Sequence, residues 1–544
     1  MANVRPIQEV ANDLGIRPEH QIPYGDSKAK IRLAAQDSGR EPGKLVLVTA
    51  VTQTSAGEGK TTSSIALGQG LAKIGEQVCV ALREPSLGPI FGKKGGATGG
   101  GKSIVVPQDD INLHFTGDFH AISTANNLLA ALLDNHLKQG NPLNLDPRRV
   151  LWRRVVDLND RALRQVIVGL GGVSEGVPRE TGFDITPASE VMAALCLSED
   201  YEDLRDRLGR ILVGQTHKRQ AVTAGELQAV GSMMVVLKDA LQPNLVQTIE
   251  GVPTLMHGGP FANIAHGCNS VVATKMALAH ADWVITEAGF GADLGMEKFF
   301  DIKCRTAGLD VVAVVVVATI RALKRHGGVK NADLGKHDPA AVERGLDNLR
   351  KHVENVKLFG KTPIVTLNHF TGDSDDEVEV VRAAAEELGV AFAVHKGFAE
   401  GGEGAVELAR TLVEHAESEP TPFRPVYELD QSIREKMEAV ATKVYGARSV
   451  QWTATALKGM RIAEKLGLGN TPLCVAKTQM SFSDDPSRAG RPTDFDITVR
   501  DLVVSAGAGF VVPLVGDLMR MPGLPKTPQA HHIDLVDGEI VGMV

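Results

Sequence analysis

GKLVLVTAVTQTSAGEGKTT, residues 43–62, is the stretch from which the fold of this chain can be predicted. It opens with an apolar run rich in β-branched residues, passes through a loop of small residues, and then enters a predicted helix. A strand, a glycine-containing loop and a helix N-terminus, in that order, predict a phosphate-binding loop (P-loop). The backbone N–H groups of such a loop and the helix dipole attract phosphate oxygens. We expect Lys60 to reach the β- and γ-phosphates of ATP and the Thr61 hydroxyl to bind Mg²⁺.

The loop departs from the usual pattern at one position, because Thr54 stands where the first glycine is expected. Gly57 and Gly59 still allow the backbone to close on a phosphate. The alternative is an ordinary turn between a strand and a helix, and the strand before the loop and the helix after it favour phosphate binding. The predicted ATP-binding residues are Thr54, Ser55, Ala56, Gly57, Glu58, Gly59, Lys60 and Thr61.

Composition places the 544-residue chain among large globular proteins of two or three domains, with 43% hydrophobic and 23% charged residues. A net charge of −8, with no basic stripe that includes aromatics, predicts neither nucleic-acid nor membrane partners. The five cysteines are scattered without a CxxC pair, which favours a reducing compartment. Because no signal-peptide pattern is seen at the N-terminus, the predicted location is the cytoplasm.

Short apolar runs alternate with amphipathic stretches along most of the chain, which predicts the fold class. The expected class is α/β, a P-loop NTPase-like, doubly wound, mostly parallel sheet with additional smaller α/β domains. We predict a large nucleotide-binding domain over residues 1–357, a second α/β domain over 358–445, and a third, C-terminal domain over 446–544. Residues 1–42 and 123–240 are polar or charge-rich and are predicted to be largely helical.

Arg83 and Glu84 follow directly after the predicted strand 77–82. Open α/β sheets place their ligand-binding groups at the carboxyl ends of strands. Arg83 offers a planar fork for a phosphate or carboxylate, and Lys60 adds a point charge. The alternative is that Arg83 only pairs with Glu84 or with another surface acid.

Two further stretches allow two interpretations each. The glycine-rich run 95–102 is typical of either a flexible linker or a lid that moves over a site. Asp118 lies between His114 and His120, which could suggest a metal site. A zinc site needs three or four convergent ligands, so we favour Asp118 as a substrate-binding carboxylate and the histidines as structural residues.

Eight segments, in the same order along the chain, resemble formate–tetrahydrofolate ligase, also called 10-formyltetrahydrofolate synthetase. The segments are residues 54–62, 83–89, 110–118, 257–267, 288–295, 401–404, 476–486 and 521–525. The resemblance implies that ATP phosphorylates formate to enzyme-bound formyl phosphate, whose formyl carbon is then attacked by tetrahydrofolate. It also implies Mg²⁺ carried by ATP, activation by a monovalent cation (K⁺ or NH₄⁺), and a homotetramer.

The resemblance implies that the domain over residues 1–357 also binds formyl phosphate and that the domain over 358–445 contributes to the folate site. It also assigns roles to particular residues. Arg83 becomes the formyl-phosphate ligand beside Lys60, and Asp118 a folate-binding carboxylate. Phe290, Phe370 and Phe398 match aromatics that hold the folate rings. Taken singly, each phenylalanine could instead belong to the core.

Three positions depart from the family pattern. Phe398 stands where tryptophan is frequent, His369 stands where arginine is frequent, and residues 102–104 lack a tyrosine that often follows the glycines. The role of His369 and the contacts of the glycine-rich run are therefore open. Two alternative functions also remain at this point: a P-loop ATPase switch, and a P-loop ligase for another carboxylate.

Overall fold

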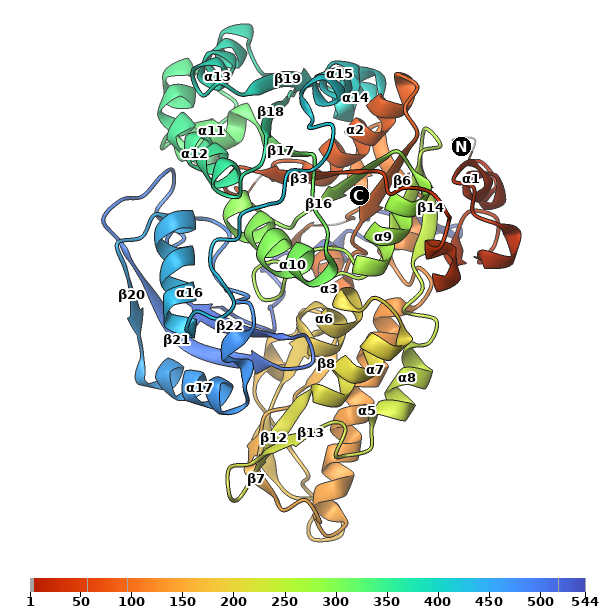
Figure 1. The fold of residues 1–544 in the computed structure, drawn as a ribbon, viewed down its shortest axis with the longest axis vertical. Coiled ribbons are helices and arrows are strands. Elements are labelled where there is room, and N and C mark those ends of the chain that lie inside the picture. Colours follow the sequence, from red (N-terminus) through yellow and green to blue (C-terminus); the bar gives the residue numbers. More distant parts are fainter. Residues whose placement is uncertain (1–3, 56, 95, 517, 544) are drawn as a thin grey trace.

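The computed structural model describes residues 4–55, 57–94, 96–516 and 518–543 of the chain. Ala56, one of the predicted ATP-binding residues, lies outside the described residues. One large sheet crosses the upper part of Figure 1. Its strands, in spatial order, are β1 (Gln21–Pro23), β2 (Ala29–Ile31), β14 (Asn244–Thr248), β15 (Pro253–Met256), β4 (Val78–Leu82), β16 (Trp283–Glu287), β3 (Lys44–Ala50), β17 (Ala313–Ala318), β18 (Pro363–Asn368) and β19 (Ala391–His395).

The seven neighbouring strands from β15 to β19 are all parallel. Their side chains alternate between two separate apolar cores, as in β3, where Leu45 and Leu47 enter one core and Val46 and Val48 the other. Strands buried on both faces read as continuous apolar runs, which explains the residue pattern of β3 and β17. The predicted α/β class with a large, mostly parallel sheet is confirmed.

Helices cover both faces of this sheet (Figure 1). α2 (Lys60–Lys73) and α15 (Val406–His415) share one apolar core, and α9 (Val271–His280) and α12 (Pro339–Leu358) share the other. Other helices associated with the sheet are α3 (Leu87–Pro89), α4 (Gln108–Asn112), α10 (Arg305–Ala307), α11 (Ile320–His326), α13 (Asp375–Glu387) and α14 (Gly397–Glu400).

The prediction that residues 1–42 are largely helical is wrong. Among the described residues of this segment, α1 (Ile7–Asp13) is the only α-helix, and β1 and β2 form an antiparallel hairpin at the edge of the central sheet. The three residues of β2 are buried although one of them is Lys30. Tertiary pairing with β14 therefore overrides the polar local pattern.

The prediction that residues 123–240 are largely helical is wrong in part. The segment contains α5 (Asp118–Lys138), α6 (Glu190–Leu197), α7 (Tyr201–Arg210) and α8 (Val230–Leu237). It also contains three small sheets, because short strands pair with partners far along the chain. They are β7 (Leu145–Val150) with β12 (Leu212–Thr216) and β13 (Ala221–Thr223), β8 (Arg154–Val156) with β11 (Phe183–Ile185), and β9 (Val166–Val168) with β10 (Arg179–Thr181).

Most of the C-terminal region lies beside this segment, below the central sheet in Figure 1, whereas its end returns to the level of that sheet, where the Met543 carbonyl accepts from Gly96 N–H. It comprises α16 (Ile433–Ala439), β20 (Ser449–Trp452), α17 (Ala454–Lys465), β21 (Asp496–Ser505), β22 (Phe510–Val515), β23 (Asp534–Val536) and β24 (Glu539–Val541). β18 and β19 continue the central sheet beyond residue 357. The division of the chain at residues 357 and 445 stays a prediction.

In the described part of the chain, no helix combines the length and the apolarity needed to cross a membrane.

Candidate functional site

The loop between β3 and α2 is shaped by two glycines. Gly57 and Gly59 adopt the left-handed conformation, with φ of +75° and +73°, which residues with a Cβ rarely adopt. A Cβ at Gly59 would also overlap the Asn368 side chain at the end of β18. No described side chain caps the N-terminus of α2. The first N–H groups of this helix can therefore donate hydrogen bonds to an anion.

Glu58 folds back inside this loop and orders it. Its Oε1 accepts a hydrogen bond of 2.6 Å from the Thr54 N–H, and Asn368 donates to the Glu58 carbonyl over 3.2 Å. Burial raises the pKa of Glu58. Thr54, the residue that replaces the first glycine, is thus held by its backbone, while Ser55 is exposed.

Lys60 and Thr61 begin α2, and Glu287 meets them from the end of β16. The Thr61 hydroxyl donates to Glu287 Oε2 over 2.9 Å. Burial lowers the pKa of Lys60 and Arg83 lowers it further, whereas Glu58 and Glu287 raise it. One electrostatically coupled group therefore lies at the ends of three adjacent strands, β4, β16 and β3. Its members are Lys60, Thr61, Arg83 and Glu287.

Arg83 is only loosely paired within this group. Its Nη2 lies 3.7 Å from Glu287 Oε1, and its Nη1 donates to the Pro260 carbonyl over 3.1 Å. Its Nε is buried and has no hydrogen-bond partner among the described residues. Glu84 does not pair with it, because the Glu84 carboxylate accepts from Gly258 N–H instead. A guanidinium with a free donor in a half-buried site is arranged to receive an anion.

Asp118 begins α5 and lies in a different, fully paired cluster. It forms an ion pair of 2.7 Å with Lys30 and accepts 2.8 Å from Asn244 Nδ2, and both charged side chains are almost wholly buried. Burial, reinforced by the neighbouring Asp118, raises the pKa of Glu84 well above its usual value. A buried carboxyl that keeps its proton can donate a hydrogen bond to a ligand.

The two histidines near Asp118 contact each other rather than a metal group. His114 Nδ1 and His120 Nε2 are 2.8 Å apart in an exposed position. Among the described residues there is no group of three or more His, Cys, Asp or Glu side chains that could hold a metal ion.

The structure brings two of the three predicted aromatics together. The Phe370 and Phe398 rings are 6.4 Å apart at an angle of 43°, and the Arg321 guanidinium lies 5.4 Å from the Phe370 ring centroid. Phe398 is 48% exposed, which is inconsistent with a core role for it. Phe290 is half-buried in the loop after β16, where its φ of +61° places a bulky residue in a conformation that costs energy.

The glycine-rich run packs against Phe398 from Gly99 onward. Gly99 and Gly100 form β5, which pairs with β6 (Ser103–Val106), and Lys102 N–H donates to the Phe398 carbonyl over 2.9 Å. A Cβ at Gly101 would overlap the Phe398 backbone. This part of the run is therefore hydrogen-bonded structure next to an aromatic pair, rather than a free linker; Gly95 lies outside the described residues.

Four further residues at this edge of the sheet were given no role in the site by the sequence analysis. Glu84, Glu287, Asn368 and His395 each lie at or just after the carboxyl end of a strand. His395 bonds Ser63 of α2 over 2.9 Å, and burial lowers its pKa to about 4. The strand-end position is the signal that could have identified all four.

The fold places polar and charged residues where parallel strands end, an arrangement typical of α/β enzymes that act on anionic substrates. The family model of formate–tetrahydrofolate ligase matches residues 1–544, the whole chain. The chain belongs to this family: it is a ligase that uses ATP to join formate to tetrahydrofolate, which yields 10-formyltetrahydrofolate, ADP and phosphate. The alternatives of an ATPase switch and of a ligase for another carboxylate are thereby set aside.

Proposed function

We propose that ligation runs through formyl phosphate, and that Lys60 and Arg83 are the residues that stabilise its formation at a P-loop formed by residues 54–61. The observation that carries this proposal is the unpartnered, buried Nε of Arg83 within the group that also contains Lys60 and Glu287. A formyl phosphate offers oxygens at both ends to a planar fork and a point charge.

In the first step, a formate oxygen attacks the γ-phosphorus of ATP and ADP leaves. Phosphoryl transfer requires positioning and charge stabilisation rather than covalent help from the protein, which Lys60, Arg83 and the N–H groups of α2 supply. In the second step, N10 of tetrahydrofolate attacks the formyl carbon, phosphate leaves and N10 loses its proton. Both steps need a site that excludes water, because the mixed anhydride hydrolyses.

Thr61 and Glu287 fit a magnesium ion brought by ATP. A hydroxyl and a carboxylate, 2.9 Å apart at the start of α2, are hard oxygen donors, and Mg²⁺ combines such donors with phosphate oxygens. When bound, the ion would neutralise phosphate charge. The Thr61 hydroxyl would turn from the Glu287 oxygen towards the ion.

The folate rings are proposed to bind along Phe370, Phe398 and Phe290, with Asp118 as the folate carboxylate. The exposed Phe398 ring beside Phe370 supports this proposal, because a pterin or benzoyl ring can stack on such faces. The Lys30 and Asn244 contacts fix the Asp118 carboxylate, so a folate nitrogen would share it with them.

We also propose the homotetramer, the cytoplasmic location and the monovalent-cation activation that membership in the family suggests. The cation is assigned no residues, since the described side chains form no group of three acidic, histidine or cysteine ligands. Light scattering of the purified chain tests the tetramer. The ligation rate in K⁺, NH₄⁺ and Li⁺ salts tests the activation.

Arg83→Lys and Arg83→Gln test the intermediate directly. Loss of the fork should remove most of the ligation rate, and more in Arg83→Gln, while the ATP Kd changes little because nucleotide binding rests on the loop backbone. The matched control is Arg40→Gln, which breaks an exposed pair with Asp282. If Arg83→Gln loses ATP affinity in proportion to its rate, Arg83 is a nucleotide ligand and the proposed role is wrong.

Positional isotope exchange in ATP tests the order of steps. With formate present and tetrahydrofolate absent, reversible formation of formyl phosphate should scramble the β,γ-bridge oxygen in the native enzyme and not in Arg83→Gln. If the native enzyme shows no exchange, formyl phosphate does not form reversibly before tetrahydrofolate binds, which contradicts the proposed order of steps.

A further inference from the structure

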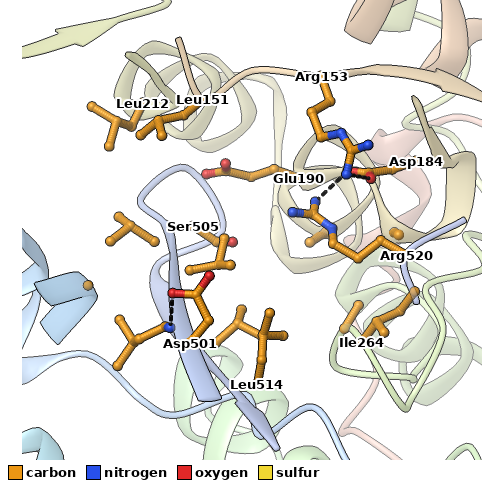
Figure 2. A pocket seen from close by; sticks show the side chains of 18 of the residues that line it. Leu151, Arg153, Asp184, Glu190, Leu212, Ile264, Asp501, Ser505, Leu514 and Arg520 are labelled. Atoms are coloured by element: carbon orange, nitrogen blue, oxygen red, sulfur yellow. Dashed lines mark hydrogen bonds and ion pairs between the residues drawn. The ribbon is translucent and has the colours of Figure 1, made fainter. Parts of the chain in front are cut away.

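A cavity of about 330 Å³ lies away from the strand ends described above, between residues 126–212 and the C-terminal region (Figure 2). Its walls come from α6, from the chain around β7 and β8, and from α17, β21 and β22. Pockets for small ligands begin at about 300 Å³, so this cavity has room for one. None of the predicted ATP or folate residues lines it.

One end of the cavity carries two arginines around a single carboxylate. Asp184 forms ion pairs of 3.1 Å with Arg153 and 2.7 Å with Arg520, and Figure 2 shows the three side chains on the same side. Asp184 is buried, whereas the two arginine side chains keep 30% and 32% of their surface exposed. Two guanidiniums against the single carboxylate of Asp184 leave a surplus positive charge at this end of the cavity as long as Glu190, which also lines it, is protonated.

The other end of the cavity is apolar. Leu151 and Leu212 lie opposite the arginines in Figure 2, and Ile264 and Leu514 line the lower wall. Leu151 is 53% exposed, so its side chain is accessible to a ligand. A cavity with a cationic end and an apolar end fits an amphipathic anion, whose charge meets the arginines and whose body covers the leucines.

We propose that this cavity is a second ligand site of the enzyme, for a small molecule with one anionic group, a carboxylate or a phosphate monoester, on an aromatic body. The anion bridges Arg153 and Arg520 through N–H groups that are not used for Asp184 or for the Arg164 carbonyl, which accepts from Arg153 Nη2. The aromatic body lies against Leu151 and Leu212.

The same loop contributes to this cavity and to the ligation site. Ile264 and Ala265 line the cavity, and Pro260, four residues before Ile264, accepts the hydrogen bond from Arg83. Lys298 also holds this loop through the carbonyls of Ala262 and Ala265. A ligand in the cavity therefore contacts a segment whose other end positions Arg83.

Glu190 makes binding depend on pH. Its Oε1 accepts 2.6 Å from Gly507 N–H, and burial raises its pKa to about 7, against the opposing effect of Arg520. The charged side chains on the elements around it are Arg153, Asp184, Arg207, Lys458, Asp501 and Arg520. Below pH 7 Glu190 is neutral and the cavity favours an anion; above pH 7 its negative charge opposes one. Affinity for an anion should therefore fall as pH rises through 7.

Calorimetric titration of the full-length enzyme with benzoate and phenyl phosphate tests the site, with neutral benzamide and inorganic phosphate as comparisons. Both aryl anions should bind more tightly than either comparison compound. Arg520→Gln should weaken their binding about tenfold, the effect of losing one charge-assisted partner, and Arg491→Gln, which breaks an exposed pair with Glu354, should not. Glu190→Gln should abolish the fall in affinity through pH 7.

Crystals grown with phenyl phosphate locate the ligand, and the ligation rate shows whether it competes with substrates. Density between Arg153 and Arg520, without competition against ATP or tetrahydrofolate, supports a second site. Equal binding of benzamide, unchanged binding in Arg520→Gln, or a cavity filled by a neighbouring subunit would overturn the proposal. The calorimetric titration and the crystals do not depend on the role of Arg83, so failure of the formyl-phosphate proposal is distinguishable from failure of this one.

Discussion

Two charged clusters, one of which contains Arg83 and the other the next residue, Glu84, differ in how completely they are paired. In the Lys30–Asp118 cluster, a 2.7 Å ion pair, the Asn244 amide and burial leave the charges satisfied by the protein. In the Arg83–Glu287 cluster, the ion pair is 3.7 Å long and Arg83 Nε has no partner among the described residues. Incomplete pairing indicates where a ligand completes the site, whereas complete pairing stabilises the fold before any ligand binds, so that a folate nitrogen at Asp118 would share a carboxylate that the protein already holds.

Lys30→Met tests the fully paired side of this comparison and should have the largest effect. It leaves Asp118 buried beside Glu84 with no cation, and breaking a buried pair costs about 3–5 kcal/mol of unfolding free energy. Urea denaturation measures the change. Arg491→Gln, from an exposed pair with Glu354, should cost about 1 kcal/mol or less. If the two variants are equally stable, Lys30 is not a structural cation.

Lys60→Ala tests the incompletely paired side. Because the lysine neutralises the transferred phosphoryl group, its loss should cost about 3–4 kcal/mol of transition-state stabilisation, on the order of 10² to 10³ in the ligation rate. Thermal stability should change little, because burial disfavours the charged form of Lys60, as its lowered pKa indicates, and the cation therefore adds little to the stability of the fold. Lys73→Ala, at the other end of α2, is the matched control for helix effects. Near-native turnover of a folded Lys60→Ala enzyme would rule out the assignment.

Phe398→Ala should have the smallest effect, and on binding alone. The ring is 48% exposed, so truncation should leave the melting temperature nearly unchanged while it raises the tetrahydrofolate KM. Phe359→Ala is the control from the core, where the buried ring stacks on Phe300 and its loss should cost about 3–5 kcal/mol. A large fall in melting temperature for Phe398→Ala, with an unchanged KM, would instead place this ring in the structural framework.

The sequence was most informative where a local pattern of residues is compatible with only one local structure. The apolar run of β3 followed by Gly57, Gly59 and Lys60 predicted a strand, a loop and a helix, and all three are found. It was misleading at β2, where Ala29 and Lys30 pair with β14, 214 or more positions away. Pairing at that separation leaves no periodic pattern in the local sequence.

The aromatic residues show the same limit. The resemblance to the family suggests Phe290, Phe370 and Phe398 as positions that bind the folate rings. Only the three-dimensional structure distinguishes the exposed Phe398 from a core side chain. Glu287 was visible as a strand end, yet its contact with Thr61 depends on β16 lying next to β3. The order of strands in a sheet follows from packing across the whole chain, which no single stretch encodes.

The sequence by itself determined the strand–loop–helix unit at residues 43–62, the α/β class and, through eight ordered segments, the family to which the chain belongs. The strand–loop–helix unit and the α/β class follow from local patterns of residues. The family follows from the identity of the residues in the eight segments. Tertiary structure decided that Arg83 faces Glu287 rather than Glu84, that Asp118 is tied to Lys30, and that Arg153 and Arg520 meet across more than 360 residues of chain. Such contacts join elements distant in the sequence, and burial and charge pairing select them only once the whole chain has folded.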